Sequence, residues 1–166
     1  MSGEKNPFVA RELESAWQKE EDQSCYDLLA LIPDGTNFRV RDLLLEMSSA
    51  TIDEKELMQR SISEKKEFGF VRRAEERVIL SGFEGGIDLD TIAGAVYSVA
   101  HPEKPAIFSH AHWDVKKHPL PGYAGIGFGD VPLFDFFIAQ YPLLECRVSF
   151  NTGDSIRSII YRGKAE

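Results

Sequence analysis

Cysteine is scarce in this sequence of 166 residues, and the two that occur do not form a metal-binding pattern. Cys25 and Cys146 belong to no Cys-x-x-Cys pair of the kind that binds zinc or carries redox chemistry. The Pro-Cys-x-x-Cys ligand pair of zinc nucleoside deaminases is therefore missing. Both cysteines have apolar neighbours in the sequence, which favours buried free thiols over a disulfide.

Long apolar segments are also missing. No stretch of about twenty apolar residues occurs, as a membrane-spanning helix would require. The first seven residues, Met1 to Pro7, lack the basic and apolar regions of a signal peptide. We therefore expect a cytoplasmic protein that does not associate with membranes.

Basic residues are outnumbered by acidic ones. The chain has 19 Lys and Arg against 27 Asp and Glu, which gives a net charge of −8. This charge repels phosphate backbones, and no basic stripe interleaved with aromatic residues offsets it, so nucleic-acid binding is disfavoured. The same acidity leaves open a protein inhibitor, such as an immunity protein, that binds a basic partner.

The first 66 residues are predicted to form a helical segment that packs on the rest of the chain and is not independent of it. A helical pattern runs from Phe8 to Leu31 and stops at Pro33-Asp34-Gly35. A short extended piece over 38–41 and a short helix over 42–47 follow. The sequence Thr51-Ile52-Asp53-Glu54 is a capping box, which predicts a helix to about Lys65 with its charged side in solvent.

Residues 67–166 are predicted to form an α/β (α+β) core, a mixed β-sheet flanked by helices. A hairpin over 68–72 and 78–83 precedes a helix that Asp88 or Asp90 caps and that ends near Ala100. A short strand over 106–108 and a long loop over 113–129 follow. A helix beginning at Asp130 should bury Phe134, Phe136 and Phe137, and a hairpin over 147–150 and 156–161 ends the chain.

The sequence His110-Ala111-His112 is the strongest candidate for a chemical centre. Two histidines one residue apart at a strand end lie on the same side of the pleat, so both imidazoles can converge on one point. Asp130, at the start of the next helix, can approach that point from the neighbouring loop end. A site of two histidines and one carboxylate suits zinc with ligand bonds of about 2.0–2.2 Å, and iron(II) uses a similar set.

Several alternatives remain open around this centre. Catalysis would need a base, and the first hairpin offers four carboxylates, those of Glu67, Glu75, Glu76 and Glu84. Asp114 and His118 are further candidate ligands. In a purely structural interpretation the histidines bond to loop backbone and Asp130 caps its helix.

Three aromatic residues lie in the loop between the second histidine and the aspartate. Trp113, Tyr123 and Phe128 can line a cleft for a peptide substrate. Alternatively, they pin the loop to the core, as aromatic side chains in such loops commonly do.

The order of these motifs resembles that of the JAMM (JAB1/MPN) zinc metalloprotease superfamily. The resemblance rests on Glu67-Phe68-Gly69-Phe70, Ser109-His110-Ala111-His112 and Gly129-Asp130-Val131 before a helix, and it covers roughly Glu67 to Arg162. It implies that His110, His112 and Asp130 bind the metal and that Glu67 accepts a proton from the attacking water. It also implies cleavage of a peptide or isopeptide bond in a protein substrate, such as a ubiquitin-like conjugate.

Two positions depart from the family pattern. Gly127 stands three residues before the aspartate, where the family has a serine that helps to bind the oxyanion, and Trp113 stands where a proline usually follows the second histidine. Loss of one oxyanion donor typically lowers the rate by about 10²–10³. The sequence therefore also supports a non-catalytic protein-interaction module of the same fold.

Overall fold

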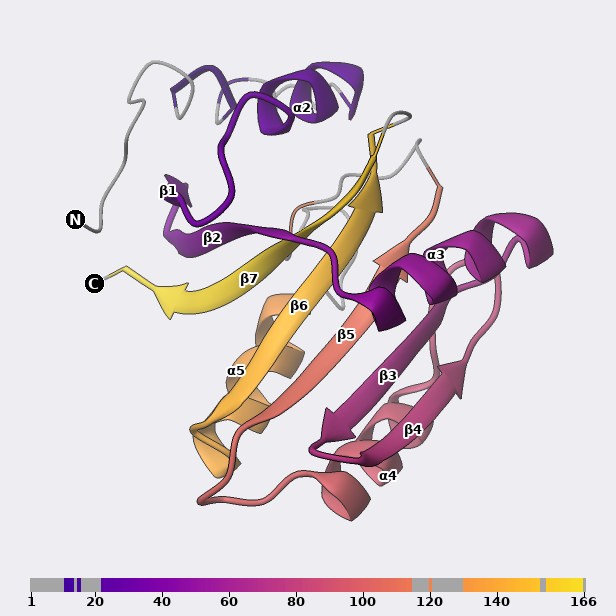
Figure 1. The fold of residues 1–166 in the computed structure, drawn as a ribbon. Coiled ribbons are helices and arrows are strands. Elements are labelled where there is room, and N and C mark those ends of the chain that lie inside the picture. Colours follow the sequence, from indigo (N-terminus) through magenta and orange to yellow (C-terminus); the bar gives the residue numbers. More distant parts are fainter. Residues whose placement is uncertain are drawn as a thin grey trace.

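The chain folds around one seven-stranded mixed sheet, so it is an α+β protein. The structure is a computed structural model that describes residues 11–13, 15, 22–114, 120, 130–152 and 155–165. Its strands lie in the order β1-β2-β7-β6-β5-β3-β4 (Figure 1). The elements, in chain order, are α2 (Asp22–Leu29), β1 (Asn37–Val40), β2 (Leu43–Ser49), α3 (Ile52–Glu64), β3 (Phe68–Arg73), β4 (Glu76–Ser81), α4 (Leu89–Val99), β5 (Ala106–His112), α5 (Asp130–Gln140), β6 (Leu144–Asn151) and β7 (Ile156–Lys164).

The N-terminal part contributes two strands to the sheet, and the prediction of a helix over 42–47 is wrong. β2 pairs antiparallel with β7, so residues 43–49 lie inside the same sheet as the C-terminal hairpin. Its burial alternates, with Leu43, Leu45 and Met47 in the core and Leu44 exposed. The period of two is typical of a strand, and three adjacent leucines obscure it in the sequence.

The remaining expected elements are found close to their predicted bounds. α3, the β3–β4 hairpin, α4, α5 and the β6–β7 hairpin all occur. α2 is the part of the first predicted helix for which the structure gives bounds, since residues 1–10, 14 and 16–21 lie outside the described set. Phe134 and Phe137 are fully buried, but Phe136 is 56% exposed, so its assignment to the core was wrong.

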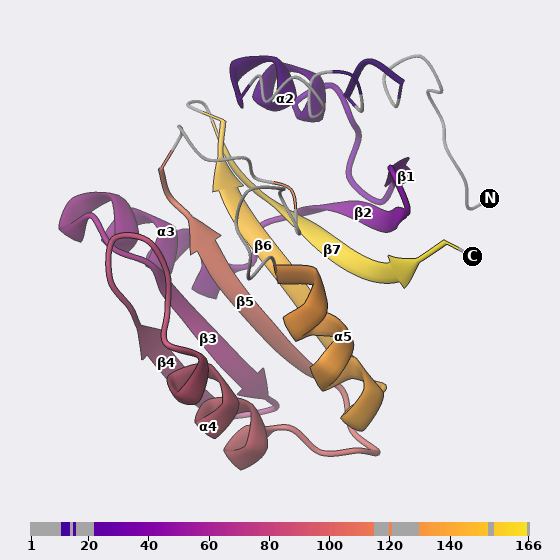
Figure 2. The same ribbon diagram turned by 180° about the vertical axis from the view of Figure 1, so that it is seen from behind.

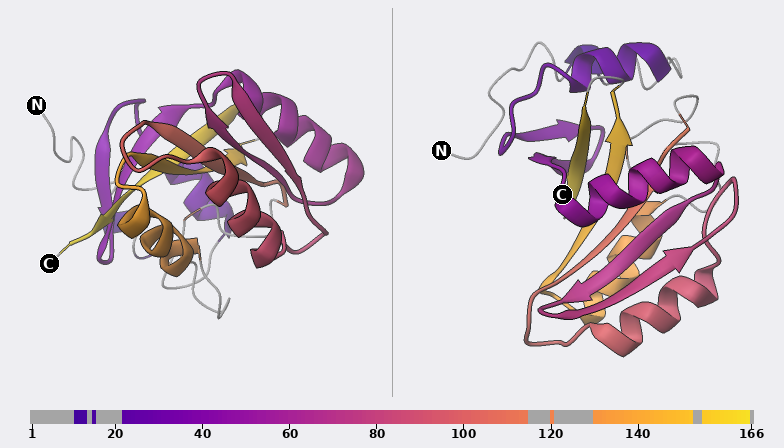
Figure 3. Two further views of the ribbon diagram at one scale, coloured as in Figure 1. Left: turned by 90° about the horizontal axis from the view of Figure 1, so that it is seen from below. Right: turned by 45° about the vertical axis from the view of Figure 1, so that its right-hand side comes forward.

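The helices cover the two faces of the sheet unequally. α4 and α5 lie on one face, over β3 and β4 and over β6 and β7 respectively (Figure 2). α3 crosses the opposite face (Figure 3), where Leu57 packs on Phe68 and Phe70. Among the described helices, none is long and apolar enough to cross a bilayer.

Glu54 is held at the centre of the α3 side of the sheet, which corrects the expectation that the charged side of this helix is solvated. The capping box forms as predicted, with Thr51 Oγ1 accepting from the Glu54 amide and Glu54 Oε1 accepting from the Thr51 amide. The same carboxylate is only 1% exposed. It accepts hydrogen bonds from Ser109 Oγ at 2.7 Å and Ser158 Oγ at 2.6 Å.

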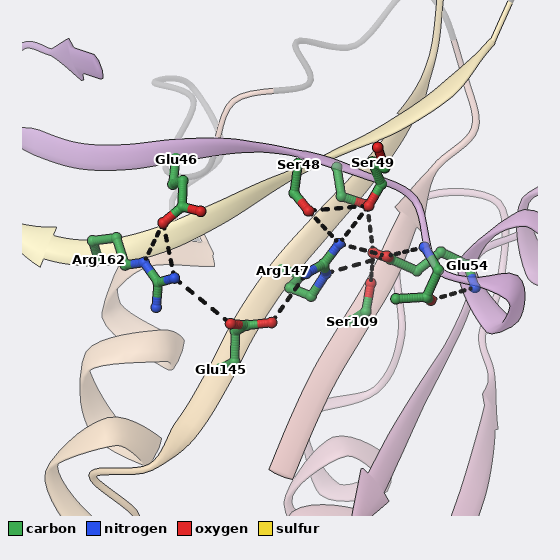
Figure 4. A network of polar contacts seen from close by, with 10 residues as sticks. Glu46, Ser48, Ser49, Glu54, Ser109, Glu145, Arg147 and Arg162 are labelled. Carbon is green, nitrogen blue, oxygen red and sulfur yellow. Dashed lines mark hydrogen bonds and ion pairs between the residues drawn. The ribbon is translucent and has the colours of Figure 1, made fainter. Parts of the chain in front are cut away.

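Arg147 neutralises this buried carboxylate. Its Nη2 lies 2.9 Å from Glu54 Oε1, and its guanidinium also contacts Glu145 and the Ser49 carbonyl (Figure 4). Burial opposes ionisation of Glu54, but Arg147 and the hydrogen bonds hold its pKa below the ordinary value. The pair therefore fastens α3 to β5, β6 and β7 at one point.

Replacement of Arg147 by methionine tests this fastening. The Arg147→Met variant leaves the Glu54 charge buried without its partner, so we expect the free energy of unfolding to fall by about 3–5 kcal/mol. Arg162→Met is the control, because Arg162 is 44% exposed and pairs with Glu46 at the sheet surface, where such pairs contribute about 0–1 kcal/mol. Urea denaturation measures both, and equal small losses would contradict the role given to Arg147.

Candidate metal centre

β5 brings the two histidines to the face of the sheet that carries α5. The strand continues to His112, beyond the predicted end at Phe108. Its register with the parallel strand β6 places His110 beside Val148 and His112 beside Phe150. Because alternate residues share a face, both imidazoles stand on the same side, with Ala111 between them pointing to the opposite face. The strand pattern therefore accounts for their convergence.

Asp130 closes the group from the first turn of α5. Its Oδ1 lies 3.2 Å from His110 Nε2, and its Oδ2 lies 3.2 Å from His112 Nε2. The two Nε2 atoms are 3.1 Å apart. All three ligand atoms lie within 4.8 Å of one another, and this is the group of potential metal ligands found among the described residues. A carboxylate in a first helical turn is also favoured by the helix dipole.

These separations suit one small cation. Zinc with four ligands at about 2.0–2.2 Å in a tetrahedron places its donor atoms about 3.3–3.6 Å apart, close to the separations of His110, His112 and Asp130. Two imidazole nitrogens at 3.1 Å repel each other both as two lone pairs and as two N–H groups. A cation or a shared proton between them removes this repulsion. The donor set and its spacing therefore fit a divalent metal with nitrogen and oxygen ligands.

Without a metal, His110 and Asp130 act as an ion pair. Burial alone would lower the pKa of His110, but the charge of Asp130 and its hydrogen bond outweigh burial and raise the pKa to about 9. Burial likewise opposes ionisation of Asp130, and the two histidines hold its pKa well below the ordinary 3.8. The centre thus keeps a full negative charge on the partly buried Asp130, as a metal ligand requires.

The environment of His110 is apolar on its other side. Its ring stacks on Phe108, with centroids 5.8 Å apart, and Phe134 lies 6.0 Å away. Its Nδ1 is buried and has no hydrogen-bond partner in the described part of the chain. Metal-binding histidines usually donate this second N–H to a carboxylate or carbonyl. The unpartnered Nδ1 of His110 is where this centre departs from that rule.

Glu67 lies next to the centre, and two of the alternative bases do not. The β3–β5 pairing ends with Gly69 opposite His110, and Glu67 stands two residues before Gly69, on the side of the histidines if the alternation of the strand continues. Glu67 is 8% exposed, and its charge contributes to the raised pKa of His110. Glu75 and Glu76 belong to the turn and strand start at the far end of β3.

The other predicted site residues fall into two groups. Trp113 and Asp114 are described and partly buried, and the Trp113 Nε1 is buried without a hydrogen-bond partner among the described residues. Glu84 is exposed in the turn after β4. The remaining positions, Tyr123, Phe128, Gly127 and His118, lie outside the described residues.

Sequence reasoning missed the polar support behind the centre. Ser109 lies between Phe108 and His110 on β5 and donates to the buried Glu54 from the opposite face. Ser149 Oγ donates to the His110 carbonyl at 3.4 Å. The signal available was Arg147, a charged residue in the middle of β6 on the face that it shares with Glu145 and Ser149. A buried charge there requires a partner.

Comparison with known proteins adds no relative. No protein-family model, curated protein or solved structure matches the chain significantly. The function is therefore inferred from the residues of the centre.

The ion pair in the centre predicts a specific pH dependence for the metal-free protein. The raised pKa of His110 contributes stability that is fully present below its ordinary value of 6.5 and is lost as the pH rises through about 9. We therefore expect the free energy of unfolding to fall between pH 6.5 and pH 9. In Asp130→Asn the pKa of His110 should fall well below its wild-type value, because the charge and hydrogen bond of Asp130 are lost and only Glu67 and Glu54 then oppose the effect of burial.

Histidine proton NMR of the metal-free protein measures the pKa directly, and denaturation at several pH values measures the stability. His101 supplies an internal reference, since it lies outside the centre and accepts a hydrogen bond from the Glu103 amide. An unchanged His110 titration in Asp130→Asn would contradict the ion pair.

Proposed function

We propose that this protein is a metal-dependent hydrolase of the JAMM type that cleaves a peptide or isopeptide bond in a protein substrate. The observation that carries the proposal is the convergence of His110, His112 and Asp130 within 4.8 Å, with the charge of Glu67 near enough to help raise the pKa of His110. The motif order along the chain supports the same assignment. Zinc is the metal we assign, since it accepts imidazole and carboxylate ligands and leaves a fourth position for water.

The residues divide the chemistry between them. His110 Nε2, His112 Nε2 and the Asp130 carboxylate would hold the ion. Zinc, when bound, supplies a Lewis acid that polarises a carbonyl and makes water acidic near neutral pH. Glu67 would be the base, and its carboxylate would take the proton of the attacking water. The buried surroundings of His110, with Phe108 and Phe134, exclude bulk water from one side.

The choice of a protein substrate follows from the resemblance to JAMM proteases. Of the three aromatic residues proposed to contact a bound chain, Trp113 directly follows His112 and is the one that the structure describes. The role of the family serine in binding the oxyanion is left open, because Gly127 carries no hydroxyl.

Zinc binding is the first test. We expect about one equivalent of zinc in the protein as purified or after zinc addition, and its loss in His112→Ala, because two ligands remain where three are needed. His101→Ala is the matched control and should retain zinc. Elemental analysis and chelator competition measure the stoichiometry and affinity. Wild-type protein that holds neither zinc nor iron after supplementation would remove the proposal.

Turnover is the second test. A ubiquitin whose C-terminus is joined to a fluorophore by an amide bond is the probe. Glu67→Gln should keep its zinc and lose about 10²–10⁴ in kcat, because the base is removed while the ligands stay. Glu75→Gln, in the exposed hairpin turn, is the control and should retain full activity.

If the zinc-loaded wild type and Glu67→Gln release the fluorophore equally slowly, the catalytic assignment fails. The non-catalytic interaction module of the same fold is then the better interpretation.

A further inference from the structure

Gly69 is the residue of β3 that faces His110 across the β3–β5 ladder. A Cβ placed on Gly69 would lie 3.1 Å from His110 Cβ and 2.5 Å from the Ser109 carbonyl oxygen. Residues with side chains that face each other in antiparallel strands keep their Cβ atoms about 4.5–5.5 Å apart. Its φ is not in the left-handed region, so glycine is needed here for space and not for backbone conformation.

The close approach occurs beside the candidate base. Glu67 directly precedes β3, two residues before Gly69, and its backbone is held by hydrogen bonds with Gly82 and Phe83. Any movement of β3 away from β5 at Gly69 therefore carries Glu67 away from His110 and His112.

Of the two strands at this contact, β5 is the one held in place. Ser109 donates to the buried Glu54, Ser149 donates to the His110 carbonyl, and β6 and β7 continue the sheet beyond β5. On the other side, β3 has α3 and α4 on its two faces, but in the plane of the sheet only β4 lies beyond it, an edge strand with Val78 and Ile79 exposed. A side chain at position 69 would consequently displace β3 and leave the metal ligands where they are.

We propose that Gly69 is a positioning residue that sets the distance between Glu67 and the His110–His112–Asp130 centre by letting β3 approach β5. This inference rests on the function proposed above, in which Glu67 is the base. It assigns to Gly69 no contact with the metal or the substrate.

The test uses the zinc-loaded full chain and the amide-linked ubiquitin probe. We expect Gly69→Ala to bind zinc within about threefold of the wild-type affinity but to lose about tenfold or more in kcat, since a displacement near 1 Å costs up to about 10²-fold. The double variant Gly69→Ala with Glu67→Gln should be no slower than Glu67→Gln alone, because the displaced group is then already absent. Gly94→Ala is the control, as its Cβ would meet nothing within 4 Å.

Amide NMR of the metal-free protein supplies a readout that does not depend on turnover. In Gly69→Ala, shift changes should concentrate in β3 and β4 and spare β6. Changes centred on His110 to His112 with a tenfold or larger loss of zinc affinity would overturn the proposal, as would unchanged kcat or additive losses in the double variant. A variant that no longer folds would also overturn the proposal, because it would show that β3 cannot shift to accommodate the added Cβ.

The failures of the two proposals are distinguishable. Absence of zinc or of turnover in the wild type refutes the proposed hydrolase function, whatever the result for Gly69→Ala. If the wild type cleaves the probe and Gly69→Ala behaves like Gly94→Ala, only the positioning role of Gly69 is refuted.

Discussion

An ionised carboxylate buried without partners costs several kcal/mol, and the position of Glu54 makes this cost a constraint on the whole sheet. Its oxygens accept from Thr51, Ser109, Ser158 and Arg147, which belong to the α3 cap and to three neighbouring strands. These donors must all be in place together, because any one of them left out would leave charge or lone pairs unsatisfied. The interaction therefore fixes where α3 crosses the sheet and fixes β5 within it.

β5 consequently has a structural face and a chemical face. Ser109 and Ala111 point towards α3 and the buried ion pair, while His110 and His112 point towards α5. The rigid support on one side is what a metal site needs on the other, since donor atoms must stay within a fraction of an ångström of their positions. Glu67 directly precedes β3, which in the plane of the sheet has only the edge strand β4 beyond it.

In the His110–His112–Asp130 centre, too, neighbouring groups offset the cost of removing a charge from water. Asp130 lies at a helix start and between two imidazoles, and these neighbours offset its burial and keep it ionised. In the metal-free state His110 holds a proton at this point, and a metal ion would replace that proton. At the proposed metal site, proton and metal would therefore compete for one position. A histidine pair that served only to hydrogen-bond loop backbone would not need a carboxylate at 3.2 Å from both rings.

Local rules were sufficient for much of this protein. The capping box at Thr51, the hairpins and the helix at Asp130 depend on near neighbours, and so does the shared face of His110 and His112; the sequence determined all of them. Three things depended on tertiary contacts. β2 forms a strand because it pairs with β7. Glu54 can be buried because Arg147, 93 residues further along the chain, neutralises it. The need for glycine at position 69 comes from the close approach of β5. Pairing partners distant in sequence leave no local pattern, so only the folded chain decides them.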